Sequence, residues 1–510
     1  MTATTASLAN SRVVPQVRLR LGGSDVDDDT LRCLGPVRVS RALSVPTACE
    51  LELIAPPSAT TFELGTELEV RVAGHDTALF GGSVVALEDR FGADGVHRLR
   101  VRAHDAAHEL RATGGVRTHV DTDVAGIAGE LFGGTGLSVH AASDGPHWPR
   151  LLQRGESDLA FFTTTCRQAG MWWQVVDDRL ELLSMPSGTD ADVRELTWGL
   201  DLLEASVTRC AVTSTDTVKV SGWDLLTATR IQGTADSDAI DGGTAARTST
   251  LTGRAFAGAD AADALADYTI GLASAAGGVL SAVVIGDPDL RPGVAVRIVT
   301  SGVAGAAMLT DSHLLTAVDH LIDDASGFVS VLSSAPPPEP AGTDLSSESL
   351  SVTLGMVVGV DDPTQSGRVR VTLPAYDDVE TDWLPVLALG AGPDKGLDCQ
   401  PDVGDLVLLT HVPGNPTAAI VLGGLHGDRT PAEGAGVGDG GVRRYGMRTP
   451  DGQVFVLDRD TDGVRLTNQA GSTVRIDDTG IVVHSAGELT LEAPGHALRL
   501  RAATIDLEQA

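Results

Sequence analysis

Apolar and polar residues alternate along most of this chain, and the alternation changes its character from one region to the next. Residues 14–110 contain runs such as "QVRLRL" and "HRLRVRAHD", in which every second residue is apolar. This pattern is typical of short strands with one face against a core. We expect helices at 123–136, 157–170 and 258–275, where the apolar spacing lengthens and a glycine follows. The first part of the chain is therefore predicted to be mainly β with added helices.

Proline, serine and glycine then divide the rest of the chain. The stretch "SSAPPPEPAGTDLSSES" (333–349) has the composition of a semi-rigid linker. About five strand-like runs follow before residue 425, which suits a small closed barrel. We expect five parts, with boundaries at 1–335, 336–350 (linker), 351–425 (small barrel), 426–452 (glycine-rich) and 453–510.

The last part has a repeat of its own. Its strand-like runs begin their apolar positions at Phe455, Val464, Val474, Ile481, Leu489, Leu498 and Ile505. The steps are 9, 10, 7, 8, 9 and 7 residues, an imperfect repeat of one strand and one turn. Short repeats of this kind predict a stacked β architecture.

One strand and turn per repeat leaves no room for a second layer from the same chain. Three identical chains would close a triangular prism with the apolar positions inside, and each inward side chain would gain roughly 1.5–3 kcal/mol by burial. Strands that pair around the axis would also leave no free sheet edge. The predicted interior consists of Phe455, Val464, Leu466, Val474, Ile476, Ile481, Val483, Leu489, Leu491, Leu498 and Leu500.

Charge and cysteine content narrow the function classes. The 510 residues carry a formal net charge of -32 with only two lysines, so nucleic-acid binding is not expected. The five cysteines are widely spaced, which predicts reduced thiols in a cytoplasmic protein rather than a disulfide framework. The first 14 residues lack a secretory signal, and the uncharged stretch 268–286 is too rich in glycine, serine and alanine for a spanning helix.

Three motifs are candidate metal sites, and no cofactor is predicted. His104 and His108 in "HDAAH" have the spacing of a zinc motif with Asp105 as the base, but a turn at a strand end is favoured. Asp458, Asp460 and Asp462 copy half of a calcium loop, although a solvated turn is the simpler interpretation. His496 shares parity with the predicted interior, so three copies would meet near the axis as a weak metal candidate.

Several motifs follow one another in the order of a known family. They are "RGESDLAFFTTTCRQAGMWWQVVDDRLEL" (154–182), "GDPDLRPGVAVRI" (286–298) and, within 351–425, the successive elements G-R-V, W-x-P-V, P-x-V-G-D and G-N-P. In this order the chain resembles the spike proteins of contractile injection machines. These are the VgrG proteins of type VI secretion, their counterparts in extracellular contractile injection systems, and phage baseplate hub-and-spike proteins.

The resemblance implies a homotrimer with a defined architecture. Residues 1–335 would form a hub of two small β-barrels with added helices, and 351–425 an oligonucleotide/oligosaccharide-binding (OB) neck. Residues 453–510 would form a triple-stranded intertwined β-helix, the spike. Implied partners are an Hcp-like inner tube protein, baseplate wedge proteins, a PAAR-type tip protein seated near Ile505 and Leu507, and effector cargo in some relatives.

The resemblance also bears on catalysis. Phage relatives carry a lysozyme domain where this chain has only a glycine-rich stretch at 426–446, so no built-in enzyme is expected. Two alternatives stay open: a β-helical enzyme acting on cell-wall polysaccharide, with the Asp477–Asp478 pair as candidate carboxylates, and an adaptor that carries an effector. The sequence leaves the type of machine, its target and its payload open, and predicts synthesis in the cytoplasm followed by assembly into a particle.

Overall fold

The computed structural model describes most of the chain. The described residues are 15–57, 62–141, 143–184, 193–209, 215–224, 229–237, 247–255, 258–299, 312–337, 351–374, 378–411, 419–427, 429, 431 and 435–508. The first 14 residues, Cys210 and most of the predicted linker lie outside these ranges. The chain divides into two units, Met1–Gly424 and Leu425–Ala510, and each is described by itself.

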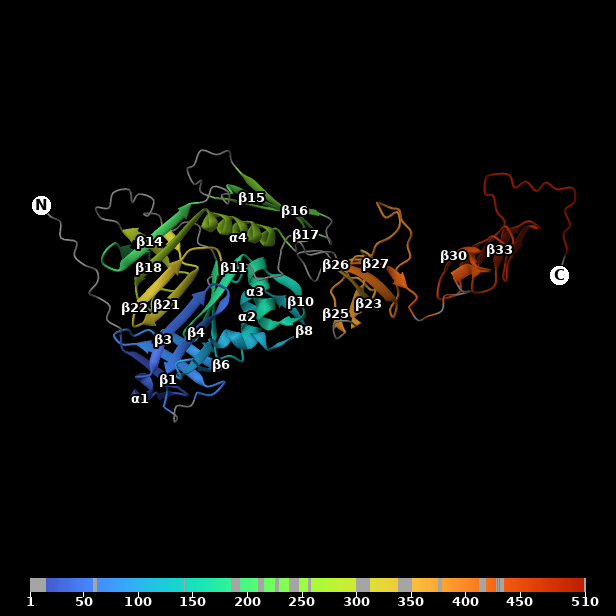
Figure 1. Cartoon of the computed structure of the whole chain (residues 1–510). Helices are drawn as coiled ribbons and strands as arrows, with labels where there is room; N and C mark the ends of the chain where they lie inside the picture. Colours follow the sequence, from blue (N-terminus) through green and yellow to red (C-terminus); the bar gives the residue numbers. More distant parts are fainter. Residues whose placement is uncertain are drawn as a thin grey trace. The chain divides into compact units, whose positions relative to one another are not determined.

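An eleven-stranded sheet organises the first unit (Figure 1). Its order is β14-β18-β22-β21-β3-β4-β7-β6-β5-β1-β2. The strands are β1 (Val17–Leu21), β2 (Ser24–Asp25), β3 (Leu34–Ala42), β4 (Val45–Ile54), β5 (Glu67–Val72), β6 (Phe80–Phe91), β7 (His97–His104), β14 (Leu202–Arg209), β18 (Gly278–Ile285), β21 (Ala317–Asp323) and β22 (Gly327–Ser333). The prediction of two separate small barrels is not confirmed, because β21 pairs along β3 and joins both groups of strands into one sheet.

The predicted helices are confirmed. They are α2 (Val124–Phe132), α3 (Asp158–Gln168) and α4 (Ala259–Gly277), alongside a short α1 (Asp28–Leu31) and a 3₁₀ turn, η2 (Ala106–Arg111). The Ser157 hydroxyl accepts from the Ala160 amide at 3.3 Å and so caps α3. None of the helices in the described ranges is long and apolar enough to cross a membrane.

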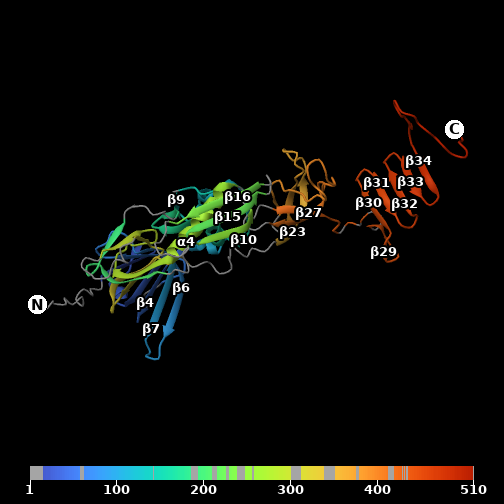
Figure 2. The same cartoon turned by 90° about the horizontal axis from the view of Figure 1, so that it is seen from above.

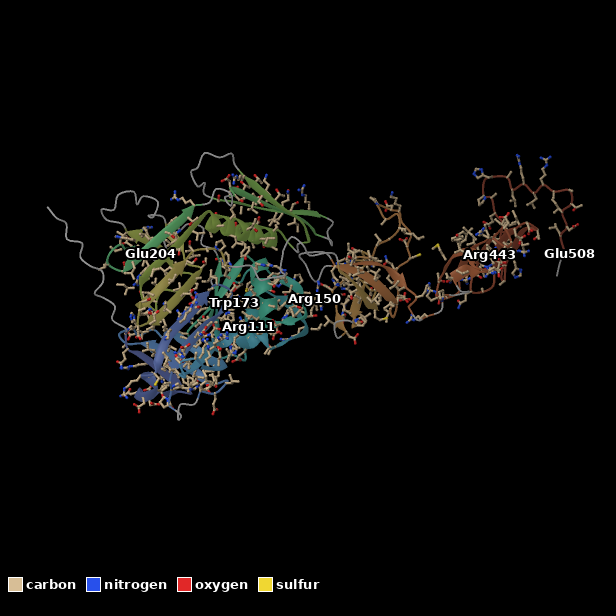
Figure 3. All side chains as sticks on the ribbon, in the orientation of Figure 1. Arg111, Arg150, Trp173, Glu204, Arg443 and Glu508 are labelled. Atoms are coloured by element: carbon tan, nitrogen blue, oxygen red, sulfur yellow. The ribbon has the colours of Figure 1, made fainter. Side chains whose placement is uncertain are left out.

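Small sheets surround these helices. They comprise β8 (Gly114–Thr122) with β10 (Trp148–Ser157); β9 (Ser138–Ala141) with β11 (Met171–Val176) and β12 (Arg179–Ser184); β13 (Arg194–Thr197) with β19 (Ala295–Val299) and β20 (Ser312–Leu314); and β15 (Thr217–Asp224) with β16 (Thr229–Asp236) and β17 (Thr248–Ala255). Trp173 of β11, labelled in Figure 3, is fully buried, and its indole N–H donates to the Thr163 hydroxyl at 3.2 Å. Its satisfied donor and large buried area help to fix the helices against this layer.

A five-stranded sheet, ordered β25-β24-β23-β26-β27, completes the first unit. Its strands are β23 (Ser351–Gly359), β24 (Arg370–Leu373), β25 (Val379–Glu380), β26 (Leu406–His411) and β27 (Ala419–Leu425). Val357, Val371 and Val407 are buried in its interior at 0–1% exposure. The alternation that predicted a small barrel here therefore corresponds to residues that point alternately into and away from this interior.

The second unit is an antiparallel meander (Figure 2). Its strands are β28 (Val437–Gly438), β29 (Gly441–Val442), β30 (Arg444–Arg448), β31 (Val454–Asp458), β32 (Gly463–Thr467), β33 (Thr473–Asp477) and β34 (Gly480–His484). We call β30–β34 the C-terminal sheet. Described residues 485–508 of the single chain contain no strand. The three further strands expected within 487–510 of a trimer stay a prediction. A strand needs a hydrogen-bonded neighbour, and these segments have none here.

Candidate functional site

One face of the C-terminal sheet carries only apolar side chains. Residues that pair directly in an antiparallel sheet project from the same face. One row of such pairs runs Met447–Phe455–Leu466–Val474–Val483, and the next runs Tyr445–Leu457–Val464–Ile476–Ile481. Every member of both rows is apolar. We call this face, made of these ten side chains, the apolar wall.

The apolar wall is largely exposed in the single chain. Ile481 is 70% exposed, Val483 55% and Leu466 50%. By contrast, Val456, which projects from the opposite face, is only 3% exposed. Large contiguous apolar surfaces of this kind mark association sites in soluble proteins. The seven predicted interior residues between Phe455 and Val483 all lie on this wall.

The remaining predicted apolar residues lie on the segment after β34. Leu489, Leu491, Leu498 and Leu500 are 55–65% exposed, and the predicted tip residues Ile505 and Leu507 are 52% and 92% exposed. His496 is also exposed, and its backbone N–H donates to the Ala493 carbonyl in a turn. The single chain does not bring these residues to the apolar wall.

A second apolar surface, which sequence reasoning missed, lies outside the OB-type sheet. Val352 and Leu354 of β23 are 60% and 43% exposed, while Val357 on the same strand is buried. Leu354 pairs directly with Leu408 and Met356 with Leu406, so the outer face is apolar as well. The signal was present in "VTLGMVVGV", where both parities carry apolar residues.

An aspartate–arginine clasp in the same sheet was also missed. The Arg368 guanidinium donates to Asp362 Oδ1 at 2.7 Å through Nη2, and the Ser366 amide donates to Oδ2 at 2.9 Å. Asp362 is only 5% exposed. The hydrogen bond from Arg368, followed by those from the Thr364 and Ser366 amides, holds the pKa of Asp362 well below its usual range. The clasp fixes the loop that begins the G-R-V element.

The calcium-like loop is a turn between β31 and β32. Asp458 lies 3.0 Å from Arg444 Nε, and Asp460 lies 3.4 Å from Arg443 Nη1. The Asp460 amide donates to Asp458 Oδ1 at 2.9 Å and, with Arg444, lowers the pKa of Asp458. Both carboxylates therefore already have cationic partners. Within the described ranges no cluster of three metal-ligating side chains occurs.

The "HDAAH" segment is likewise a strand end followed by a 3₁₀ turn. His104 Nδ1 lies 3.3 Å from the Thr47 carbonyl and His108 Nδ1 lies 2.7 Å from the Asp105 carbonyl. The Asp105 carboxylate accepts from the Thr47 and Ala107 amides at 2.6 and 3.1 Å. Burial raises its pKa to about 6. Asp105 thus holds together the turn that was expected at this strand end.

Asp477, one of the two carboxylates considered for a polysaccharide-degrading site, is engaged by its own neighbours. Asp477 lies 3.2 Å from Arg475 Nε and accepts the Thr479 amide at 2.9 Å. These hydrogen bonds to Thr479, the largest cause, and the nearby Arg475 lower the pKa of Asp477. A carboxylate held ionised in this way is a poor general acid.

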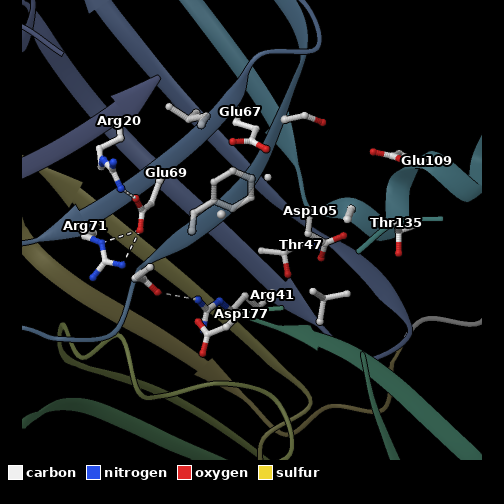
Figure 4. Close-up of a pocket in the computed structure, with 18 of the residues that line it drawn as sticks. Arg20, Arg41, Thr47, Glu67, Glu69, Arg71, Asp105, Glu109, Thr135 and Asp177 are labelled. Atoms are coloured by element: carbon white, nitrogen blue, oxygen red, sulfur yellow. Dashed lines mark hydrogen bonds and ion pairs between the residues drawn. The ribbon is translucent and has the colours of Figure 1, made fainter. Parts of the chain in front are cut away.

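A cavity of about 550 Å³ lies beside β4, β5 and β6 (Figure 4). Its charged groups bind one another: Glu69 lies 3.2 Å from Arg20 and 2.6 Å from Arg71. Arg41 donates to the Leu79 carbonyl at 2.8 Å. Its lining also includes the carboxylates of Glu67, Asp105, Glu109 and Asp177.

Comparisons with known proteins indicate the class of protein to which this fold is similar. The family model described as the type VI secretion system/phage-baseplate injector OB domain matches residues 353–426. A model of the Alg8 N-terminal domain matches 55–257, a range that begins after β4 and ends before α4 and so cuts through the eleven-stranded sheet. No curated protein matches the chain.

Solved structures agree with the OB match. The chain resembles the Escherichia coli c3393 protein, a type VI secretion component, with a TM-score of 0.52, 15% identity, and coverage of 80% of this chain and 99% of that one. It resembles the Francisella PdpA–VgrG complex in its lidded form with a TM-score of 0.57, 9% identity, and coverage of 92% and 80%. It also resembles the 43 kDa tail protein of prophage MuSo2 from Shewanella oneidensis, with a TM-score of 0.50, 16% identity, and coverage of 62% of this chain and 97% of that one.

The chain is therefore a mainly β protein with the fold of phage tail and type VI secretion proteins, and it carries an injector-type OB domain. The resemblance to VgrG-like hub-and-spike proteins is confirmed.

Proposed function

We propose that this protein is the central hub and spike of a contractile injection machine, acting as a homotrimer. The apolar wall carries the proposal. Ten apolar side chains share one face of a sheet that no described residue of its own unit covers. Burying such a face between chains is strongly favourable, at about 25 cal/mol per Å² of apolar surface.

Threefold symmetry suits this wall. Three copies arranged around an axis would turn their walls inward and close a prism, which is a self-limited assembly. The apolar outer face of the OB-type sheet offers a second contact of the same kind.

The mechanism is mechanical. Residues 1–335 cap the inner tube and contact the wedge proteins, the OB domain (351–425) is the neck, 426–452 is the connection, and 453–510 is the piercing spike. Sheath contraction supplies the force, and hydrogen bonds between neighbouring strands supply stiffness. A PAAR-type protein seats on Ile505 and Leu507, whose exposed side chains need a cover. The protein is made in the cytoplasm and is delivered with the particle.

Light scattering on the full-length protein tests the proposal. We expect the mass of three chains at micromolar concentration, and dissociation for Leu466→Glu, which places a charge in the middle of the apolar wall. Arg465→Glu is the matched control, since it is adjacent on β32 but projects from the opposite face, and it should leave the trimer intact. A stable monomer at micromolar concentration would refute the threefold assembly.

A further inference from the structure

The polar face of the C-terminal sheet carries hydrogen-bond donors in a regular arrangement. Arg465 of β32 pairs directly with Arg475 of β33, and Thr467 pairs directly with Thr473 in the next row of the same face. His484 of β34 lies opposite Thr473 and extends that row. Directly paired residues have Cβ atoms about 4.5–5.5 Å apart. These five side chains form one surface, which we call the donor patch.

The donor patch has an excess of positive charge. Like charges placed directly opposite each other destabilise a sheet, and the two arginines are such a pair. Arg475 Nε lies 3.2 Å from Asp477 Oδ2, whereas Arg465 contacts no carboxylate in the described part of the chain. The Thr467 and Thr473 hydroxyls likewise make no hydrogen bond to described residues. Both arginines are exposed, so these donors are available to solvent.

Directly opposed arginines also occur in the first unit, where Arg18 of β1 lies opposite Arg71 of β5 and Arg90 of β6 lies opposite Arg98 of β7. Arg71, Arg90 and Arg98 each have a carboxylate within 4.0 Å. Other arginines of this unit lie between two acids. Arg100 of β7 lies 3.0 Å from Glu50 on one neighbouring strand and 3.7 Å from Glu88 on the other. The apolar wall does not require an opposed arginine pair on the other face, and Arg465 has no carboxylate partner among the described residues. A bound anion between the two guanidinium groups would remove their repulsion.

We propose that the donor patch binds phosphate groups. Planar guanidinium groups match the geometry of phosphate oxygens and bind them through paired hydrogen bonds. The threonine hydroxyls and the His484 imidazole can donate further hydrogen bonds at the edge of the same surface. The inference goes beyond the proposed function and rests on it only for access: with the apolar wall turned inward, the donor patch faces outward on each of the three chains.

The experiment uses the full-length protein with two probes. One arm titrates inorganic phosphate by calorimetry, and the other measures co-sedimentation with phosphatidylglycerol vesicles, using phosphatidylcholine vesicles as the reference surface. We expect the double variant Arg465→Gln, Arg475→Gln to weaken binding about tenfold. The matched control is Arg459→Gln, an exposed arginine of the β31–β32 turn that lies outside the donor patch and donates to the Val442 carbonyl. This control should bind as the unchanged protein does.

The two arms identify the source of the phosphate. Binding of inorganic phosphate that the double variant loses supports a site for the free anion. Binding confined to phosphatidylglycerol vesicles and lost in the double variant supports a lipid headgroup. Absence of binding in both arms, or equal losses in the double variant and the control, overturns the proposal. Light scattering on the same samples reports the trimer separately, so failure here is distinguishable from failure of the proposed function.

Discussion

Two sheets of this protein have the same alternating pattern of apolar and polar residues, but their apolar faces differ in burial. In the eleven-stranded sheet, the inner residues Val39, Leu51 and Val101 are completely buried. In the C-terminal sheet, the equivalent face is the apolar wall, where Leu466 is 50% exposed. The strands are equally regular, so alternation alone does not make a core. What differs is whether the unit also supplies a second layer.

The polar faces of the two sheets differ as well. On β4, β7 and β6, Arg100 and Arg102 both contact Glu50 and Glu88 within 4.0 Å. Arg90 of β6 lies opposite Arg98 of β7, but each of these two also contacts a carboxylate. Across β32 and β33, an arginine lies opposite an arginine. The first surface neutralises itself, while the second leaves charge for something outside the chain.

The largest expected effect separates the two apolar faces. Leu51→Ala removes a completely buried side chain and should cost about 2–5 kcal/mol of unfolding free energy at any protein concentration. Leu466→Ala should cost much less in the dilute chain, and its cost should grow as the concentration rises and the apolar wall becomes covered. Urea unfolding at two concentrations measures both. Equal, concentration-independent losses would contradict the contrast between the sheets.

A smaller effect tests whether polar contacts also stabilise the OB domain of the first unit. Asp362→Ala removes the clasp with Arg368 and should lower the thermal midpoint of the OB domain. Because the pKa of Asp362 is lowered in the folded state, its contribution is present above the unfolded value, about 3.9, and is lost as the pH falls further through the folded pKa.

Calorimetric unfolding across acidic pH checks this prediction. Asp361→Ala is the matched control, because Asp361 is exposed and the variant makes the same charge change one residue away. If both variants shift the midpoint equally, the clasp does not stabilise the domain.

The smallest effect concerns the charged face of the eleven-stranded sheet. Arg100→Gln should cost no more than about 1 kcal/mol, because paired surface charges contribute little. The cost should shrink further at about 1 M salt, where charges are screened. Denaturant unfolding at low and high salt measures the difference. A loss that salt does not change would assign the role of Arg100 to packing of its aliphatic stem.

Local signals predicted the elements of this fold better than their pairing. The helices α2, α3 and α4 and the strands β31–β34 were predicted, because capping, glycine stops and alternation are written in neighbouring residues. The joining of β21 to β3 was not predicted, since this pairing links residues almost 300 positions apart. The segments after β34 alternate in the same way but have no partner strand in the single chain, so their strands stay a prediction for the trimer.

The candidate surfaces show the same limit. Parity placed Phe455, Val474 and Ile481 on one face, and the register confirms that they share it. The clasp of Asp362 with Arg368 and the pairing of Arg465 with Arg475 were missed. Both depend on which residues meet across a loop or between strands, and single-strand periodicity carries no such information.

The exposed apolar wall also dictates an order of events during biogenesis. A C-terminal sheet with its apolar wall exposed is prone to aggregation in a crowded cell, because the wall can associate non-specifically with other apolar surfaces. In the assembly we propose, the larger unit folds first in each chain, and three copies of it then associate. This association raises the local concentration of the tethered C-terminal sheets far above that in bulk solution. The three C-terminal sheets can then associate quickly into the spike, which leaves little time for non-native contacts.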